Sequence, residues 1–131
     1  MSHIPELSKR GNVVAVGWLH PDHPFNTGAV PEAFTARLKE FARLWYLTGK
    51  AIGAGAMGGV HTCEFCQKSL ASGSIVVPAG SVLFRAPEMI YHYVEKHAYL
   101  PPKEFIDAVM ACPMPGTLDF IKAAAPFKRQ A

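Results

Sequence analysis

The sequence predicts an α+β fold with a small, mostly antiparallel sheet, and three observations lead to this prediction. Short apolar runs rich in β-branched residues indicate strands, and two of these runs flank a tight turn typical of a hairpin. A longer segment has apolar residues at every third or fourth position, which indicates an amphipathic helix. Two cysteines precede the hairpin and two histidines follow it, in the pattern of metal ligands.

Length and composition indicate a single globular domain that spans residues 1–131. Half of the residues are hydrophobic and 18% are charged, so the chain can bury a substantial core. No segment approaches the roughly 20 consecutive apolar residues of a membrane-spanning helix, and the N-terminal residues lack the apolar core of a signal peptide. Because three cysteines cannot all pair, we expect a reduced, soluble, cytoplasmic protein.

The first elements are a strand and a turn-rich loop. Residues 1–12 are expected to form a flexible N-terminus. Residues 13–19 form a short apolar run rich in β-branched side chains, which predicts a buried strand. Two prolines and a glycine within residues 20–28 then predict a loop. His20, Asp22 and His23 in this loop are either a small acid–base or metal cluster or, as the prolines favour, an exposed turn.

A long amphipathic helix is predicted over residues 31–47. Pro31 is suited to the first helical position, and Gly49 marks the end of the apolar repeat. A glycine-rich connector over residues 48–60 follows. Residues 53–58 match the GxGxxG pattern of dinucleotide-binding loops, but that motif requires a strand before it and a helix after it. A helix precedes it here, so we interpret the match as coincidental.

The C-terminal half is predicted to contain a hairpin and three helices. Residues 75–77 and 82–84 read as two strands joined by a tight turn. Prolines then delimit the helices predicted over residues 87–97, 103–112 and 117–125, since proline begins a helix readily and cannot continue one.

The metal-ligand pattern consists of Cys63, Cys66, His92 and His97. Zinc takes four nitrogen or sulfur ligands in a tetrahedron, and CxxC spacing places both sulfurs on one turn. The order of cysteine turn, hairpin and histidine-bearing helix is similar to ββα and treble-clef zinc folds. We therefore predict a zinc-clasped knuckle–hairpin–helix unit over residues 61–98, with a structural Zn²⁺ ion.

The alternative is that two free cysteines and two helix histidines have separate structural roles. His92 and His97 are five residues apart, so their directions diverge by about 140° on a regular helix. They can converge if the last turn loosens or if His97 lies just past the helix end. If they do not, His61 is the reserve ligand in place of His92. We interpret Cys112 as a small hydrophobic residue that packs in the core.

Several motifs run through most of residues 13–110: Val16-Gly17-Trp18-Leu19, Pro24-Phe25-x-Thr27-Gly28, His61-x-Cys63-Glu64-x-Cys66, Ala86-Pro87-Glu88 to His92-Tyr93, His97-x-Tyr99-x-Pro101-Pro102 and Phe105-Ile106-x-Ala108-Val109. Together they resemble the motifs of a family of short uncharacterised bacterial proteins. The resemblance implies a bacterial cytoplasmic source. It makes the four ligands a plausible unit and implies no activity.

A zinc-stabilised binding or adaptor protein without catalysis is the function that these features favour. The alternative is a small metal-dependent hydrolase, with zinc-activated water and Glu64 or Glu95 as base. A second alternative is a zinc-finger-like protein that binds nucleic acid weakly, which the net charge of +3 disfavours. The expected partner is a protein or peptide. Its predicted contact surface is the aromatic region around Tyr91, Tyr99 and the prolines at 101–102.

Overall fold

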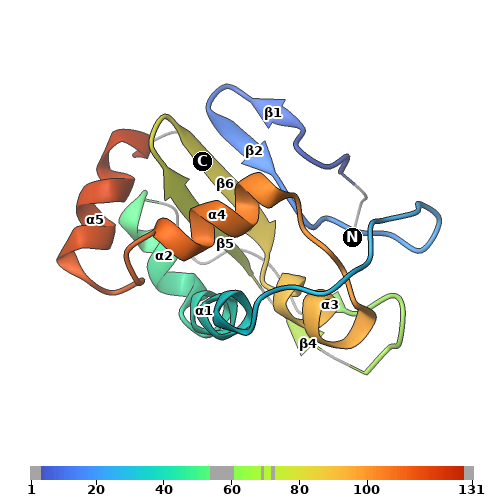
Figure 1. Cartoon of the computed structure of the whole chain (residues 1–131). Coiled ribbons are helices and arrows are strands. Elements are labelled where there is room, and N and C mark those ends of the chain that lie inside the picture. Colours follow the sequence, from blue (N-terminus) through green and yellow to red (C-terminus); the bar gives the residue numbers. More distant parts are fainter. Residues whose placement is uncertain (1–3, 54–60, 69, 72, 129–131) are drawn as a thin grey trace.

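The computed structural model describes residues 4–53, 61–68, 70–71 and 73–128, and it has the predicted α+β fold (Figure 1). Its main sheet is mixed but mostly antiparallel, with strand order β1-β2-β6-β5. A second, two-stranded sheet pairs β3 with β4. The strands are β1 (Lys9–Arg10), β2 (Val13–Ala15), β3 (His61–Thr62), β4 (Leu70–Ala71), β5 (Ser74–Ala79) and β6 (Val82–Pro87).

The predicted hairpin is confirmed as strands β5 and β6. They pair antiparallel, with Val77 opposite Phe84 and Ser74 opposite Pro87. Gly80 has φ +63°, the left-handed conformation that a tight turn demands and glycine adopts without strain. The ladder therefore extends through Pro87, which corrects the prediction that this proline begins a helix. Proline is tolerated there because the end of a strand needs no further backbone donor.

The predicted strand over residues 13–19 is shorter than expected, and its partners could not be read from local sequence. Strand β2 pairs antiparallel with β1 on one side and parallel with β6 on the other. The N–H group of Val16 continues this parallel contact by donating to the Arg85 carbonyl. The expected flexible N-terminus of residues 1–12 therefore includes a paired strand, while residues 1–3 lie outside the described residues.

Five α-helices lie in the described part of the chain, and α2, α4 and α5 contact strand β5 of the sheet. The predicted helix over residues 31–47 is divided at Leu44, where the backbone leaves the helical region (φ −105°, ψ 28°). The second helix turns to pack against β5 and continues past the predicted stop at Gly49. Residues 54–60 of the predicted connector lie outside the described residues. The helices are α1 (Glu32–Arg43), α2 (Trp45–Ala51), α3 (Ile90–His97), α4 (Lys103–Ala111) and α5 (Leu118–Ala124), followed by a 3₁₀ turn, η1 (Ala125–Phe127).

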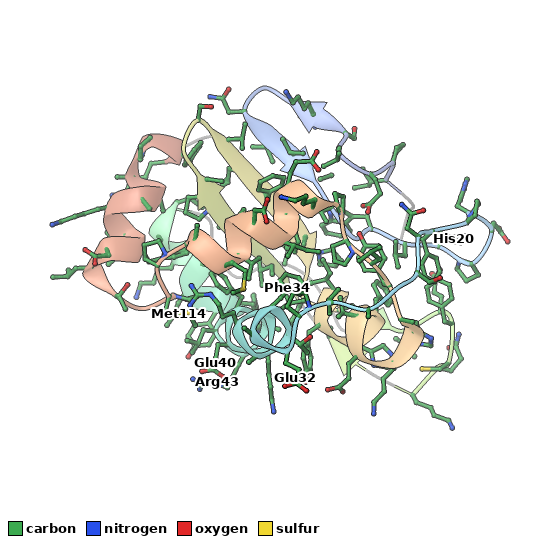
Figure 2. The ribbon with its side chains drawn as sticks, viewed as in Figure 1. His20, Glu32, Phe34, Glu40, Arg43 and Met114 are labelled. Carbon is green, nitrogen blue, oxygen red and sulfur yellow. The ribbon has the colours of Figure 1, made fainter. Side chains whose placement is uncertain are left out.

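Aromatic side chains join the helices to the sheet. Phe105 of α4 contacts Phe34 of α1 and Phe84 of β6 with edge-to-face ring geometry, and all three are buried. In Figure 2, Phe34 lies on the inner side of α1, whereas Glu40 and Arg43 form an ion pair on its outer side. This division of apolar and charged faces confirms the amphipathic character predicted for the segment. No helix in the described part of the chain is both long and apolar enough to span a bilayer.

Helix α2 protects the outer edge of the sheet through the buried residue Thr48. Its hydroxyl accepts a hydrogen bond from the Val76 N–H group at 3.1 Å and donates to the Trp45 carbonyl at 2.8 Å. Strand β5 is the last strand of the sheet, so the Val76 N–H group would otherwise lack a strand partner. The threonine hydroxyl thus satisfies a backbone donor that burial would make costly to leave unpaired.

We expect Thr48→Val to destabilise the protein by about 1–3 kcal/mol, because an isosteric methyl group leaves the buried Val76 N–H group without an acceptor. Urea unfolding followed by circular dichroism measures this change. Thr35→Val on α1 is the matched control, since Thr35 is only half-buried and its hydroxyl makes a long 3.5 Å contact within its own helix. Equal, small losses for both variants would contradict the role assigned to Thr48.

Candidate metal centre

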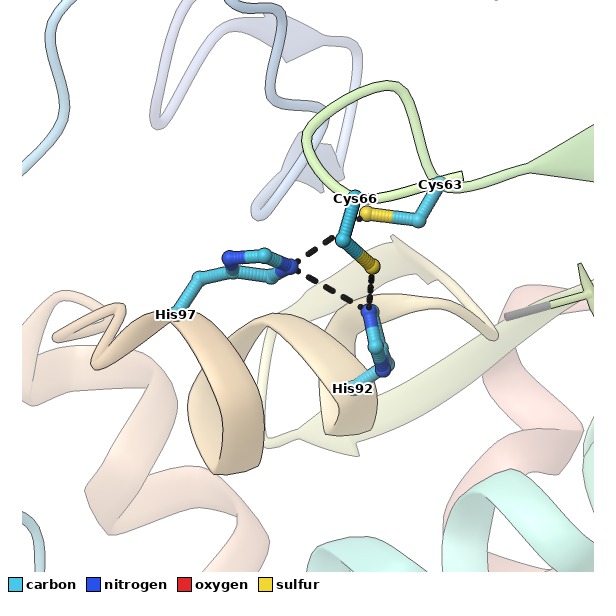
Figure 3. Close-up of side chains that lie close together, drawn as sticks. All are labelled: Cys63, Cys66, His92 and His97. Atoms are coloured by element: carbon cyan, nitrogen blue, oxygen red, sulfur yellow. Dashed lines mark hydrogen bonds between the residues drawn. The ribbon is translucent and has the colours of Figure 1, made fainter. Parts of the chain in front are cut away.

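The two cysteines lie on a tight turn between β3 and β4. These two-residue strands pair antiparallel, so the chain reverses direction across residues 63–68. Within the turn, the Gln67 N–H group donates to the Cys63 carbonyl at 2.8 Å, and Gln67 adopts a left-handed conformation with φ 60°. The reversal holds the two cysteine side chains on the side of the turn that faces α3 (Figure 3). We call residues 63–67 the knuckle.

Both histidines project from α3 toward the knuckle. His97 is the last helical residue, and Ala98 follows it in the left-handed conformation. The N–H group of Tyr99 donates a hydrogen bond to the Tyr93 carbonyl at 3.1 Å, which caps the C-terminal end of the helix. The imidazole rings of His92 and His97 converge despite their five-residue spacing, because each ring points toward the knuckle with Nε2, the nitrogen farther from the backbone. The two Nε2 atoms are 3.2 Å apart.

Three distances between the four ligand atoms are close to those of a tetrahedral metal site. The Sγ atom of Cys63 is 3.5 Å from His97 Nε2, and the Sγ atom of Cys66 is 3.3 Å from His92 Nε2 (Figure 3). All four atoms lie within 4.8 Å of one another. Zinc bonds of about 2.3 Å to sulfur and 2.0–2.1 Å to nitrogen would place ligand atoms about 3.3–3.8 Å apart in a tetrahedron. The four side chains could therefore hold a metal ion.

The local electrostatics also suit a cation. Burial raises the pKa of the Cys63 thiol, although N–H groups of Cys66 and Phe65 hydrogen-bond the sulfur and partly offset this effect. Burial, with a smaller contribution from His97, lowers the pKa of the His92 imidazole. Neutral imidazole is the form that binds metal, whereas a buried thiolate needs a neighbouring positive charge. A metal ion at the centre of the cluster would supply that charge.

An aromatic layer packs behind the metal ligands. Phe65 of the knuckle contacts the rings of His97, Tyr93 and Phe25, with centroid distances of 5.3, 5.6 and 5.3 Å. Tyr93 is almost fully buried, and this burial raises the pKa of its hydroxyl to about 12. The phenol therefore stays neutral and is no competitor for a metal. The layer joins the knuckle to α3 and to the loop that contains Phe25.

His20 in the loop before α1 lies 3.6 Å from the Asp22 carboxylate and also contacts the knuckle. His20 Nδ1 accepts a hydrogen bond from the Asp22 N–H group at 3.1 Å. The Nε2 atom of His20 is 3.4 Å from a carboxylate oxygen of Glu64. Asp22 and His23 are exposed, as expected for a surface turn. Glu64, one of the two bases considered for a hydrolase, therefore contacts His20.

The remaining candidate ligands have different positions. Cys112 is 4% exposed and belongs to the apolar core, and burial raises the pKa of its thiol to about 11. This agrees with its interpretation as a packed hydrophobic residue. The side chain of His61, the reserve ligand, lies outside the described residues. The convergence of His92 and His97 removes the geometric reason for a substitute.

A hollow of about 500 Å³ opens beside the metal ligands. Glu95 at this hollow accepts a hydrogen bond from the Tyr91 hydroxyl and lies 3.8 Å from the Lys96 ammonium. Sequence analysis did not identify the hollow, because its walls come from two separate segments. The lining residues are Cys66, Lys68, Tyr91, His92, Glu95, Lys96 and His97.

The predicted aromatic contact surface is wrong for two of its four residues, which are buried. Tyr99 is 1% exposed, and its hydroxyl donates to Glu6, a residue that also accepts from the Gly17 N–H group. Pro101 is buried as well, whereas Tyr91 and Pro102 are partly exposed. The aromatic pattern therefore reflects a core that joins α3 to the N-terminal segment.

Comparison with known proteins shows which family this chain belongs to. Neither the curated proteins nor the solved structures include a match. A family model described as a domain of unknown function, DUF7919, matches residues 2–110. The match takes in the knuckle and the whole of α3, and it ends before α5. The chain therefore belongs to the DUF7919 family.

Proposed function

We propose that this protein is a small zinc-stabilised binding module without catalytic activity, in which Cys63, Cys66, His92 and His97 hold one Zn²⁺ ion. The spacing of the four ligand atoms is the observation that carries the proposal. Two sulfurs and two imidazole nitrogens complete a tetrahedral shell and leave no position for a reactive water. The role of the metal is then to fasten the knuckle to α3.

The small size of the knuckle supports a structural role for the metal. Its flanking strands have two residues each, which is too few for a self-supporting sheet. Metal binding would therefore supply much of the free energy that holds this segment in place. The partner that we propose is a protein or peptide, and the partly exposed side chains around the hollow are its contact surface.

A metal-dependent hydrolase is the second candidate, and the hollow is the observation that favours it. Three of the four metal ligands line the hollow, together with the carboxylate of Glu95. Catalysis would require His92 or another ligand to leave the shell so that a water could bind, with Glu95 as its base. The number of protein ligands on the metal separates the two candidates.

Metal analysis tests the proposal directly. We expect purified protein to carry about one equivalent of zinc, as a closed Cys₂His₂ site does. Cobalt substitution should give the visible bands of tetrahedral Co²⁺ and thiolate charge-transfer bands for two sulfurs. Absence of metal after purification without chelator, with the thiols of Cys63 and Cys66 freely titratable, would contradict the proposal. Three protein ligands and one water on the metal, as X-ray absorption spectroscopy can resolve, would instead favour the hydrolase.

A further inference from the structure

The two cysteines of the knuckle differ in their access to solvent. Cys63 has no exposed surface, whereas Cys66 is half-buried and lines the hollow. A small molecule in the hollow therefore contacts Cys66, whereas the buried Cys63 is shielded from it. The N–H groups of Phe65 and Cys66 also hydrogen-bond the Cys63 sulfur.

Polar and charged side chains line the hollow around Cys66. Lys68 and Lys96 both contribute to this lining. The carboxylate of Glu95 is already engaged by Tyr91 and Lys96. A hydroperoxide is small enough to enter a space of about 500 Å³. The hollow thus lets a hydroperoxide approach a sulfur ligand, with proton donors nearby.

We propose that Cys66 is a site of oxidation by hydroperoxides and that Cys63 is its resolving partner, an inference that rests on the proposed zinc site. Cys66 Sγ attacks one peroxide oxygen, the O–O bond breaks, and the departing oxygen is protonated to water or an alcohol. The product is a sulfenic acid at Cys66. Cys63 Sγ then attacks the Cys66 sulfur, forms a disulfide and expels hydroxide, which is protonated to water.

The two thiolates together lose two electrons, and these reduce the peroxide. The ligand atoms already lie within 4.8 Å of one another, so the disulfide requires only local movement of the knuckle. With both sulfurs bonded to each other, only His92 and His97 remain as ligands. The site then releases its metal, and the knuckle loses its attachment to α3.

The experiment uses zinc-loaded protein carrying Cys112→Ala, so that only the knuckle thiols remain. Hydrogen peroxide is added, and zinc release is followed with a chromogenic chelator while mass spectrometry follows oxidation. We expect zinc release to keep pace with the loss of two hydrogens, which marks a Cys63–Cys66 disulfide. Dimedone added during the reaction should label Cys66 and leave Cys63 unlabelled, as fragment-ion spectra can resolve.

Cys66→His is the matched variant, because imidazole preserves a four-ligand site while removing the accessible sulfur. We expect this variant to retain zinc. Under the same peroxide, its rate of zinc release should be at most about one tenth of that of the parent protein. Zinc that stays bound while both thiols remain reduced would overturn the inference and leave the proposed zinc site intact. Dimedone labelling of Cys63 alone would also overturn it. Protein that never contains zinc would instead contradict the proposed function.

Discussion

Replacing Cys66 by serine is expected to abolish tight metal binding and to destabilise the protein by about 4 kcal/mol, which lowers Tm by about 10–20 °C. The serine hydroxyl is a poor zinc ligand, because it does not ionise as a thiol does. Differential scanning calorimetry together with metal analysis measures both effects.

The size of this effect follows from what the metal centre joins. The knuckle lies between two strands of two residues each, so backbone pairing alone supports it weakly. Phe65 of the knuckle packs on His97 and Tyr93 of α3, and it also contacts Phe25. Loss of one ligand would loosen both the metal attachment and this aromatic layer.

Chelation of the unmodified protein provides the first control. Zinc removal should lower Tm about as much as Cys66→Ser does, and a chelator should have no further effect on the variant. Cys112→Ala is the matched control, because Cys112 is buried in the core at a distance from the knuckle. It should cost about 1–2 kcal/mol through a small cavity and remain sensitive to chelation. Equal losses for both variants, each insensitive to chelator, would show that the cysteine pair has no metal role.

Gly73→Ala is expected to destabilise the protein by about 2–4 kcal/mol through overpacking. A Cβ atom at this position would overlap the six-membered ring of the Trp45 indole. Equilibrium unfolding in urea would measure the loss, and near-ultraviolet circular dichroism would report the displaced tryptophan.

The backbone at Gly73 cannot move away from Trp45, because Glu88 forms hydrogen bonds with both the carbonyl and the N–H group of Gly73. The Gly73 carbonyl accepts a hydrogen bond from the Glu88 N–H group at 2.8 Å, and the Gly73 N–H group donates to the Glu88 carboxylate at 3.3 Å. The overlap must therefore be relieved by moving Trp45 and the start of α2, which packs along β5. Movement of that helix would disturb the protected edge of the sheet.

A smaller side chain at position 45 should rescue the substitution. Trp45→Leu alone is expected to destabilise the protein by loss of packing, whereas Gly73→Ala in that background should add less than about 1 kcal/mol. Additive losses in the double variant would mean that the indole ring is not the obstacle. The cost of the alanine would then have to arise from the backbone of residue 73.

Much of the fold could be predicted from local sequence pattern. The hairpin was recognisable because β-branched runs flank Pro78 and Gly80, and both signals act over a few residues. The helix predicted over residues 103–112 closely matches α4 (Lys103–Ala111), since the prolines before and after it mark its bounds. In contrast, the break at Leu44 has no glycine or proline signal. It arises because α2 turns to pack against β5.

The sequence by itself determined the candidate ligands, because CxxC and paired histidines combine residue types that few other sites need. It could not determine whether His92 and His97 meet, since their directions diverge on an isolated helix. The tertiary structure decided this, by placing the knuckle where both Nε2 atoms reach it.

Three further features depend on contacts between segments far apart in the chain. The parallel pairing of β2 with β6, the burial of Tyr99 and the hollow beside Cys66 are of this kind. Local periodicity records which face of an element is apolar and carries no information about which distant segment will cover it. Only packing of the whole chain selects that partner. The candidate ligand set could therefore be identified from the sequence, whereas its geometry and the position of Cys66 at the hollow were properties of the fold.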